Sequence, residues 1–172
     1  MRLKDKVAII TGAGSGIGAA TAVAMAAEGA RVLVADVNEA GAKATVQKIE
    51  AARGQALAMT ADVTRAADNE ALVERTSAAW GRLDVFFANA GVPQWKTDVE
   101  EVDEKTFDTI FDVNVKGVYL GAKFALPVMK RAGRGVFLIT ASTAAIRPRP
   151  GGQIYAASKG EASGARRSAT SP

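Results

Sequence analysis

Residues 7–18 read VAIITGAGSGIG, and this stretch decides the fold. Its apolar start has the composition of a buried parallel strand, and an alanine-rich helical pattern follows from Ile17 to about Gly29. Glycines at such a junction let the backbone turn tightly and approach a phosphate, which the free N–H groups of the next helix attract. The Gly-x3-Gly-x-Gly spacing differs from the Gly-x-Gly-x-x-Gly fingerprint, but its place between strand and helix predicts dinucleotide binding. A plain glycine turn is the alternative.

The rest of the chain repeats the order of strand and helix. We expect strands at residues 31–36, 57–60, 83–88 and 136–140, and helices at 38–53, 64–80, 104–131 and from about 155. Asn38 and Thr64 are the expected N-caps of two helices, and Pro127 is expected to kink the long one. Repeated βα units predict an α/β fold, a Rossmann-like doubly wound parallel sheet.

The composition excludes several kinds of chemistry. The chain has no cysteine and no histidine, which removes disulfides, thiolate nucleophiles, a Ser-His-Asp triad and a histidine-based zinc site. We therefore expect no metal site. Acid–base chemistry must use Tyr, Lys, Asp or Glu.

Charge and hydropathy limit the kinds of partner that this chain is expected to bind. The net charge of +4 comes from the residues after position 146, because residues 1–146 carry equal numbers of acidic and basic side chains. The body shows no basic face interleaved with aromatic residues, so we expect no nucleic-acid partner. No stretch approaches the roughly 20 apolar residues that span a bilayer, and the N-terminus does not resemble a signal peptide. We expect a cytoplasmic protein without a membrane partner.

Asp36 ends the second predicted strand, 18 residues after Gly18. A carboxylate at this place accepts hydrogen bonds from the ribose hydroxyls of an adenosine and repels a 2′-phosphate. Neither Ser15 nor Val37 is basic, so neither compensates the negative charge. Asp36 therefore predicts NAD in preference to NADP. A helix-capping aspartate is the alternative, and the two roles are compatible.

Tyr155 and Lys159 stand four residues apart and share one face of a helix. A phenol is a poor base at neutral pH, and a nearby ammonium together with a positive nicotinamide ring favours its ionised form. Tyr155 can then take the proton of an alcohol as hydride leaves for NAD, or donate it in reverse. Ser142, just past the fifth strand, can hold the substrate oxygen. The alternatives are an interface aromatic, a solvated charge and a loop hydroxyl.

These motifs together resemble the short-chain dehydrogenase/reductase family over about residues 5–160. In chain order they are the glycine pattern, Asp36, Asp62-Val63, Asn89-Ala90-Gly91, Asn114, Ser142 and Tyr155-x3-Lys159. The resemblance implies that Asp62 and Val63 contact the adenine and that Asn114 holds a water in a proton relay. It also implies that the Asn-Ala-Gly segment lines the cofactor.

Two sets of site residues follow. The predicted catalytic residues are Asn114, Ser142, Tyr155 and Lys159. The predicted cofactor-binding residues are Gly12, Ser15, Gly16, Ile17, Gly18, Asp36, Asp62, Val63, Asn89, Ala90, Gly91, Tyr155 and Lys159.

The predicted function is NAD-dependent interconversion of a secondary alcohol and a ketone. The alternatives are a non-catalytic dinucleotide-binding fragment, a 3-oxoacyl-thioester reductase, and a Rossmann-type epimerase, which also uses a Tyr-x3-Lys pair. The resemblance implies a small-molecule alcohol or ketone as substrate and a homodimer or homotetramer as assembly.

The last residues differ from the body of the chain. After Ile154 there is no Val, Leu, Ile, Met, Phe or Trp, so a helix there lacks an apolar stripe. We expect residues 1–159 to form the NAD-binding domain and residues 160–172 to be a disordered tail. The family usually continues for two more strands, so the resemblance implies a domain truncated at its C-terminus. We expect this chain to bind cofactor weakly, if at all, and to turn over little or no substrate.

Overall fold

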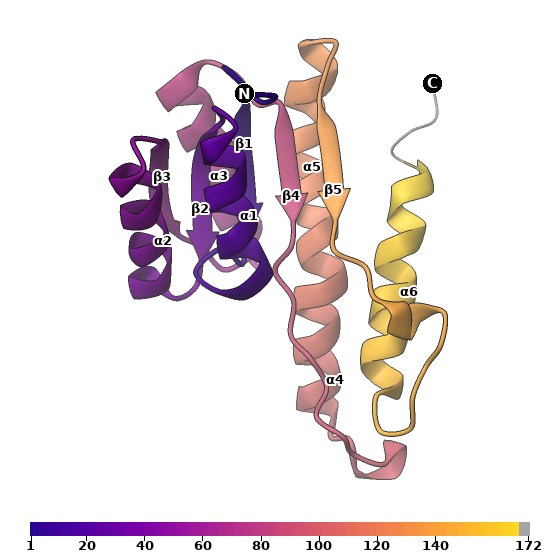
Figure 1. Ribbon diagram of the computed structural model, residues 1–172. Coiled ribbons are helices and arrows are strands. Elements are labelled where there is room, and N and C mark those ends of the chain that lie inside the picture. Colours follow the sequence, from indigo (N-terminus) through magenta and orange to yellow (C-terminus); the bar gives the residue numbers. More distant parts are fainter. Residues whose placement is uncertain (169–172) are drawn as a thin grey trace.

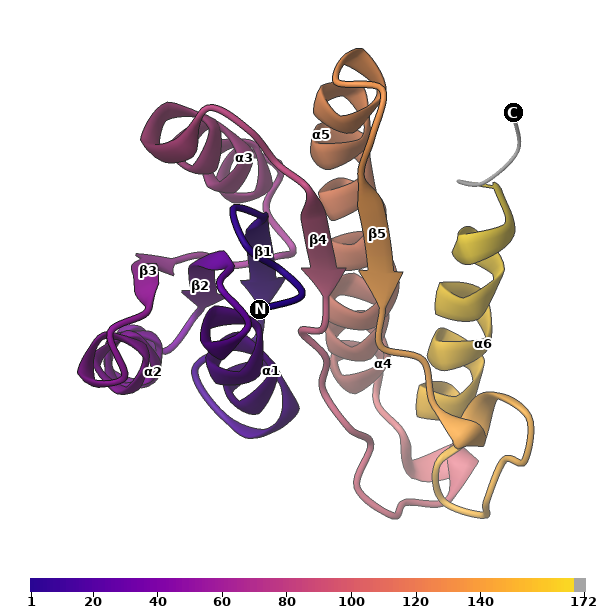
Figure 2. The same cartoon turned by 45° about the horizontal axis from the view of Figure 1, so that its top comes forward.

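The computed structural model describes the backbone of residues 1–168 and the side chains of residues 1–161. The strands of this part are β1 (Val7–Thr11), β2 (Arg31–Asp36), β3 (Gln55–Thr60), β4 (Val85–Ala88) and β5 (Val136–Ile139). All paired strands run parallel, in the order β3-β2-β1-β4-β5 (Figure 1). Figure 2 shows the same order with the sheet tilted toward the viewer. This confirms the predicted Rossmann-like α/β sheet.

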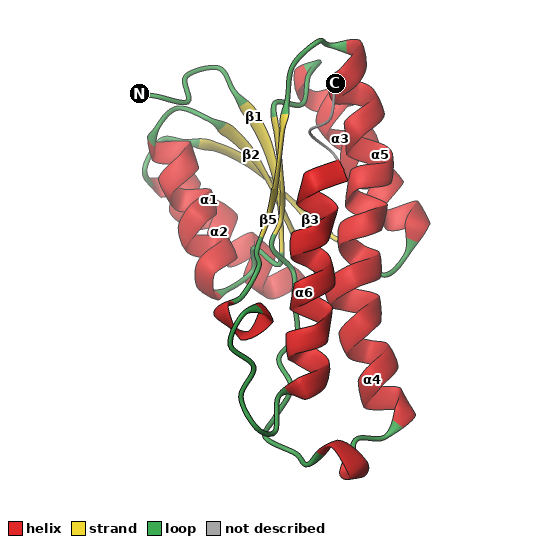
Figure 3. Ribbon diagram, turned by 90° about the vertical axis from the view of Figure 1, so that its right-hand side faces the viewer, coloured by secondary structure: helices red, strands yellow, loops and turns green. Residues whose placement is uncertain are grey.

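Helices cover both faces of the sheet. They are α1 (Gly16–Ala27), α2 (Glu39–Ala51), α3 (Ala66–Trp80), α4 (Glu104–Phe111), α5 (Gly117–Arg131) and α6 (Gln153–Ser168). In Figure 3, α1 and α2 lie on one side of the sheet, and α3, α5 and α6 lie on the other. Among the described residues, no helix is both long enough and apolar enough to cross a bilayer.

Two apolar cores lie between the sheet and the helices on its two faces. Successive strand residues point to opposite faces. Ile10 and Val34 accordingly pack in the core beneath α1 and α2, while Ile9, Leu33 and Phe86 pack in the core beneath α3 and α5. Because β1 is buried on both faces, its sequence is a continuous apolar run rather than an alternating one.

The strand order places a crevice at the middle of the sheet. The chain leaves β1 toward β2 on one side and later returns to form β4 on the other side of β1. The loops that follow β1 and β4 therefore diverge at the carboxyl ends of these strands. This divergence is the place where open α/β sheets bind their ligands.

The long helix expected at residues 104–131 is interrupted. A π-helical segment, Asp112–Lys116, lies between α4 and α5 and contains the buried Asn114. The chain is helical from Glu104 to Arg131 as expected, but the apolar periodicity of the sequence does not reveal the extra residue in the π-helical turn. Pro127 lies inside α5, and the helix continues past it to Arg131.

The two expected N-caps have different outcomes. Asn38 caps α2 as predicted, because its Oδ1 accepts a hydrogen bond from the Gly41 N–H at 3.0 Å. Thr64 does not cap α3, which follows Arg65. The Thr64 hydroxyl instead donates to Asp62 Oδ1 at 2.8 Å. A local turn around the aspartate therefore takes the hydroxyl that the sequence assigned to the helix.

The C-terminal segment continues the last helix. We expected disorder from residue 160, whereas α6 extends to Ser168, and residues 169–172 lie outside the described residues. Alanine, glutamate and arginine have good helix propensity, which accounts for a helix without an apolar stripe. Disorder of this tail in solution stays a prediction.

The strand β5 forms one edge of the sheet in the part of the chain that the structure describes. Its residue Phe137 faces the core and stacks on Phe86, with ring centroids 5.2 Å apart. The alternate residues Val136 and Leu138 are 51% and 44% exposed on the opposite face. An apolar surface thus lies beside an unpaired strand edge, an arrangement that favours association.

Candidate active site

A cavity of about 610 Å³ opens at the carboxyl ends of the central strands. Every residue that the sequence predicts to bind the cofactor lines it, from the glycine turn to Tyr155 and Lys159. The sequence did not single out six further lining residues: Val37, Ala61, Val92, Pro93, Val113 and Thr140. Each is an ordinary loop or helix residue in its local context, so no motif identifies it.

The glycine turn after β1 forms one wall. Gly12 has a φ of +62°, a backbone conformation that favours glycine, and a Cβ there would lie 2.8 Å from the Ala90 Cα. A Cβ on Gly18 would collide with the Gly12 carbonyl oxygen and lie 2.6 Å from Asn89 Nδ2. Ser15 precedes α1 without giving it a side-chain cap. The N–H groups in the first turn of α1 can therefore donate hydrogen bonds to an anion. The glycine backbone without side chains lets a pyrophosphate approach closely.

Asp36 is held at the edge of the cavity by two backbone groups. Its Oδ2 accepts from the Gly14 N–H at 2.8 Å, and its Oδ1 accepts from the Asn38 N–H at 2.9 Å. The cap of α2 is Asn38, so Asp36 orients the capping residue rather than capping the helix itself. Each carboxylate oxygen has two lone pairs, so both keep capacity for a ligand hydroxyl.

The loop after β3 is held by the first turn of α3. Asp68 Oδ2 accepts from the Asp62 N–H at 2.9 Å. The buried Asn69 donates through Nδ2 to the carbonyl oxygens of Val63 and Arg65, each at 2.8 Å. Sequence reasoning missed Asp68 and Asn69, although a carboxylate and an amide in a first helical turn are a signal for contacts with the preceding loop.

Polar side chains join the ends of β1, β4 and β5. Thr11 Oγ1 accepts from the N–H groups of Asn89 and Ala90, both at 3.1 Å. Asn89 Nδ2 donates to the Thr11 carbonyl at 3.0 Å, and Thr140 Oγ1 donates to Asn89 Oδ1 at 3.0 Å. Asn89 therefore fixes the geometry of three strand ends on which the cavity is built.

Lys159 extends from α6 into the molecule. Its residue is only 3% exposed, and Nζ donates to the Thr140 carbonyl at 2.9 Å. Nζ also lies 5.9 Å from the centroid of the Tyr155 ring. Burial lowers the pKa of the Lys159 ammonium. The alternative of a solvated surface charge is therefore wrong for Lys159.

Asn114 is buried and does not line the cavity. Its Oδ1 accepts from the Val92 N–H at 2.9 Å, while Nδ2 donates to the Val92 carbonyl and to Ser158 Oγ, both at 3.0 Å. Ser158 Oγ in turn donates to the Tyr155 carbonyl at 2.8 Å. Asn114 thus connects the loop after β4 to α6.

Ser142 does not line the cavity either. It precedes the short 3₁₀ helix Thr143–Ala145, and its Oγ accepts from the Ala144 N–H at 3.1 Å. Of the four predicted catalytic residues, the structure therefore places Tyr155 and Lys159 on the cavity wall, and Asn114 and Ser142 are not part of that wall.

Comparison with known proteins shows which family this chain resembles. The family model described as short chain dehydrogenase matches residues 6–171. An uncharacterized oxidoreductase of Thermotoga maritima is 40% identical over 98% of this chain and 66% of its own length. Levodione reductase of Leifsonia aquatica is 39% identical over 92% of this chain and 60% of its own length.

A solved structure shows the same arrangement. A short chain dehydrogenase/reductase from Burkholderia phymatum, in complex with NAD, superposes with a TM-score of 0.93 at 32% identity. That match covers 98% of this chain and 60% of the other. The chain thus spans between 60% and 66% of the lengths of these three proteins.

Proposed function

This chain belongs to the short-chain dehydrogenase family, and on that premise we propose that its cavity binds NAD and serves hydride transfer between a secondary alcohol and a ketone. One observation carries the proposal. A single cavity extends from the glycine turn and Asp36 to Tyr155 and Lys159, and the sequence predicted all of these residues independently. Its partners in this proposal are a small-molecule alcohol or ketone and, by family resemblance, further copies of the chain.

The side chains have separate tasks in this proposal. Bound NAD supplies the hydride acceptor. Tyr155 takes the proton of the substrate hydroxyl at its Oη, and it returns that proton when the reaction runs toward the alcohol. Lys159 is fixed by the Thr140 carbonyl, and its Nζ lies 5.9 Å from the centroid of the Tyr155 ring on the wall of the same cavity.

The preference for NAD over NADP belongs to the same proposal. Asp36 lines the cavity with its carboxylate already oriented by Gly14 and Asn38. Among the described residues that line the cavity, Lys159 is the basic one, and it lies on α6 rather than near β2. A 2′-phosphate near Asp36 would therefore meet negative charge without a compensating cation.

A second candidate function is dinucleotide binding without catalysis. It is favoured by Ser142, whose hydroxyl lies off the cavity wall and accepts from Ala144. A substrate oxygen then lacks the donor expected to hold it as charge develops.

The test is a titration of the purified chain with NAD, followed by assays with a panel of secondary alcohols and ketones. Saturable binding with turnover supports the proposal, and binding without turnover supports the second candidate. The panel includes a 3-oxoacyl thioester, which identifies the reductase alternative if it is strongly preferred. Product formed without net change of the cofactor identifies an epimerase. Absence of NAD binding would overturn the proposal.

A further inference from the structure

The first turn of α6 takes its hydrogen-bond acceptor from a distant loop. Gln94 Oε1 accepts from the N–H of Ile154 at 2.9 Å and from the N–H of Tyr155 at 3.1 Å. The N–H groups of a first helical turn have no partner within the helix and are usually satisfied by a side chain just before it. Here the two preceding residues are Gly151 and Gly152, which have no side chain to offer. Gln94 fills this position from the loop after β4.

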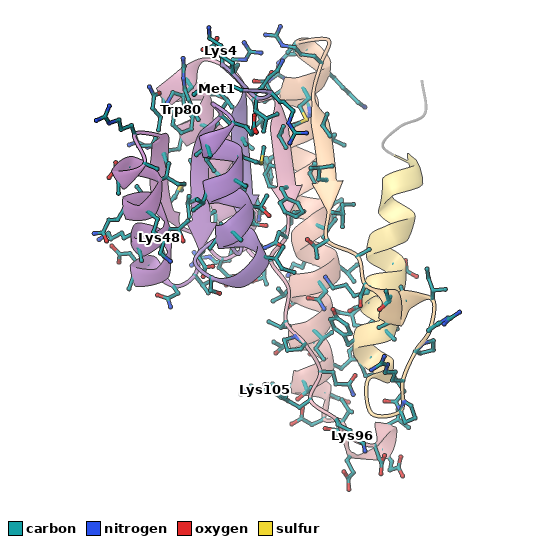
Figure 4. The ribbon with its side chains drawn as sticks, in the orientation of Figure 1. Met1, Lys4, Lys48, Trp80, Lys96 and Lys105 are labelled. Atoms are coloured by element: carbon teal, nitrogen blue, oxygen red, sulfur yellow. The ribbon has the colours of Figure 1, made fainter. Side chains whose placement is uncertain are left out.

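The loop that carries Gln94 is itself held on both sides. On one side, Asn114 forms two hydrogen bonds with the backbone of Val92. On the other side, the Thr97 N–H donates to the Gly151 carbonyl at 3.3 Å. Figure 4 shows Lys96, the residue before Thr97, at the same end of the molecule as the start of α6. Hydrogen bonds on both sides of Gln94 therefore fix the backbone of its loop, and this backbone places the Gln94 amide next to α6.

The backbone of Tyr155 is fixed at both of its polar groups. Its N–H donates to Gln94, and its carbonyl accepts from Ser158 Oγ. Ser158 is buried and receives a further hydrogen bond from Asn114. Because the phenol extends from this backbone, the position of Oη depends on both contacts. A catalytic group displaced by about 1 Å can lose roughly 10²-fold in rate.

We infer that Gln94 is a positioning residue, which sets the first turn of α6 and thereby the place of the Tyr155 hydroxyl. The inference rests on the proposed function, in which Tyr155 moves the proton. Gln94 touches neither the cavity nor the reacting atoms, and it acts through the backbone of Tyr155.

Three variants separate this role from a general effect on folding. Gln94→Leu removes the acceptor at similar size, whereas Gln94→Glu keeps an acceptor oxygen and places a negative charge at the helix N-terminus, where it is favourable. Gln153→Leu is the matched control. It makes the same change two residues before Tyr155, and Gln153 Oε1 is buried without a hydrogen-bond partner.

Amide hydrogen exchange tests the contact without any need for turnover. In Gln94→Leu we expect the amides of Ile154 and Tyr155 to exchange about fivefold faster or more, as for a lost helix cap. The amides of Ile9 and Ile10 in β1 should keep their rates, which shows that the fold persists. Gln94→Glu and Gln153→Leu should resemble the unaltered protein. Unchanged exchange at Ile154 and Tyr155 in Gln94→Leu would overturn the inference.

Kinetics test the consequence. Gln94→Leu should lower kcat about tenfold while KM for NAD stays within about twofold, and Gln94→Glu should recover most of the loss. Faster exchange with unchanged kcat would also overturn the inference, because the cap would then not position the phenol. If the unaltered chain shows no turnover, the proposed function fails on that ground. In that case the inference is decided by the order of the Tyr155 ring. It is measured by NMR with and without Gln94→Leu in a Tyr119→Phe background, which leaves one tyrosine. An equally ordered ring in both proteins would overturn the inference.

Discussion

Lys159 Nζ donates to the Thr140 carbonyl oxygen at 2.9 Å, so a buried ammonium connects α6 to the end of β5. Thr140 is also the residue whose hydroxyl bonds Asn89, and Asn89 joins β4 to β1. The Tyr155 helix is therefore linked to the centre of the sheet through polar groups rather than through an apolar stripe. This linkage explains how a helix poor in large apolar residues packs against the domain.

The burial of Lys159 gives a dependence of stability on pH. Burial lowers the pKa of its ammonium in the folded protein, so the folded chain releases this proton at a lower pH than the unfolded chain. Between the lowered value and that of an exposed lysine, about 10.4, the unfolded chain binds more protons, and the folded state gains stability as the pH rises. Relative to Lys159→Met, the unaltered protein should therefore gain stability toward alkaline pH. Denaturant unfolding of both proteins from pH 7 to 10 measures this difference, and a constant or falling difference would contradict it.

Tyr155→Phe should reduce turnover by at least about 10²-fold and leave NAD affinity within about twofold, because it removes the hydroxyl alone. The measurement is steady-state kinetics together with cofactor titration, in whichever length of the protein turns over. Lys159→Ala should lower both turnover and NAD affinity, because it also removes the hydrogen bond to the Thr140 carbonyl. Most of the turnover retained in Tyr155→Phe would show that another group moves the proton.

Asp36→Ala should abolish the preference for NAD. The variant loses a carboxylate that the Gly14 and Asn38 N–H groups orient toward the cavity, so NAD affinity should fall about tenfold while NADP affinity stays equal or rises. Asp36→Asn is the control, because it keeps an acceptor oxygen without the charge. Titration of each protein with both cofactors gives the ratio of dissociation constants. Tighter binding of NADP than of NAD by the unaltered chain would contradict the proposed role of Asp36 in cofactor preference.

Asp84→Asn should destabilise the fold by about 2–3 kcal/mol at neutral pH. The carboxylate has 6% of its side chain exposed and accepts from the Val7 N–H at 2.9 Å and from Arg82 at 2.6 and 2.8 Å. Burial alone would raise the pKa of Asp84, but the hydrogen bonds from Arg82 and Val7 lower it further than burial raises it.

Such a lowered pKa stabilises the fold above the value for an unfolded aspartate, about 3.9, and the stabilisation disappears as the pH falls through the folded value. The difference between Asp84→Asn and the unaltered protein should therefore shrink in acid. Urea unfolding at pH 7 and at pH 3 checks it. An equal difference at both values would mean that charge is not the cause.

Leu138→Lys should reduce self-association of this chain. Leu138 is 44% exposed beside Val136 on the outer face of the edge strand β5, and a charge on an edge strand opposes pairing with another chain. Light scattering over a range of concentrations compares the variant with the unaltered protein. Gln47→Lys, an exposed change on α2 that adds the same single positive charge, controls for net charge. Equal association in all three proteins would exclude β5 as the contact.

Residues 7–18 and Asp36 could be placed from the sequence because each position depends on its neighbours in the chain, whereas the Asn89 segment was placed by the resemblance to a known family. An apolar run followed by glycines forms a strand and a tight turn wherever it folds, and the carboxyl ends of parallel strands meet at one edge of the sheet. These residues and those that the resemblance supplied all line one cavity. The interruption of the long helix could not be predicted from the sequence, because its π-helical segment leaves the apolar period almost unchanged.

The sequence by itself therefore determined the α/β class, the glycine turn, the carboxylate after β2 and the Tyr-Lys pair on one helix. The tertiary structure alone decided what holds that pair. Asn114 reaches Val92 across 22 residues and Ser158 across 44, and Gln94 reaches Ile154 across 60. Such contacts leave no local period or spacing in the chain, because they exist only after separate loops have been brought together by the packing of the sheet and its helices.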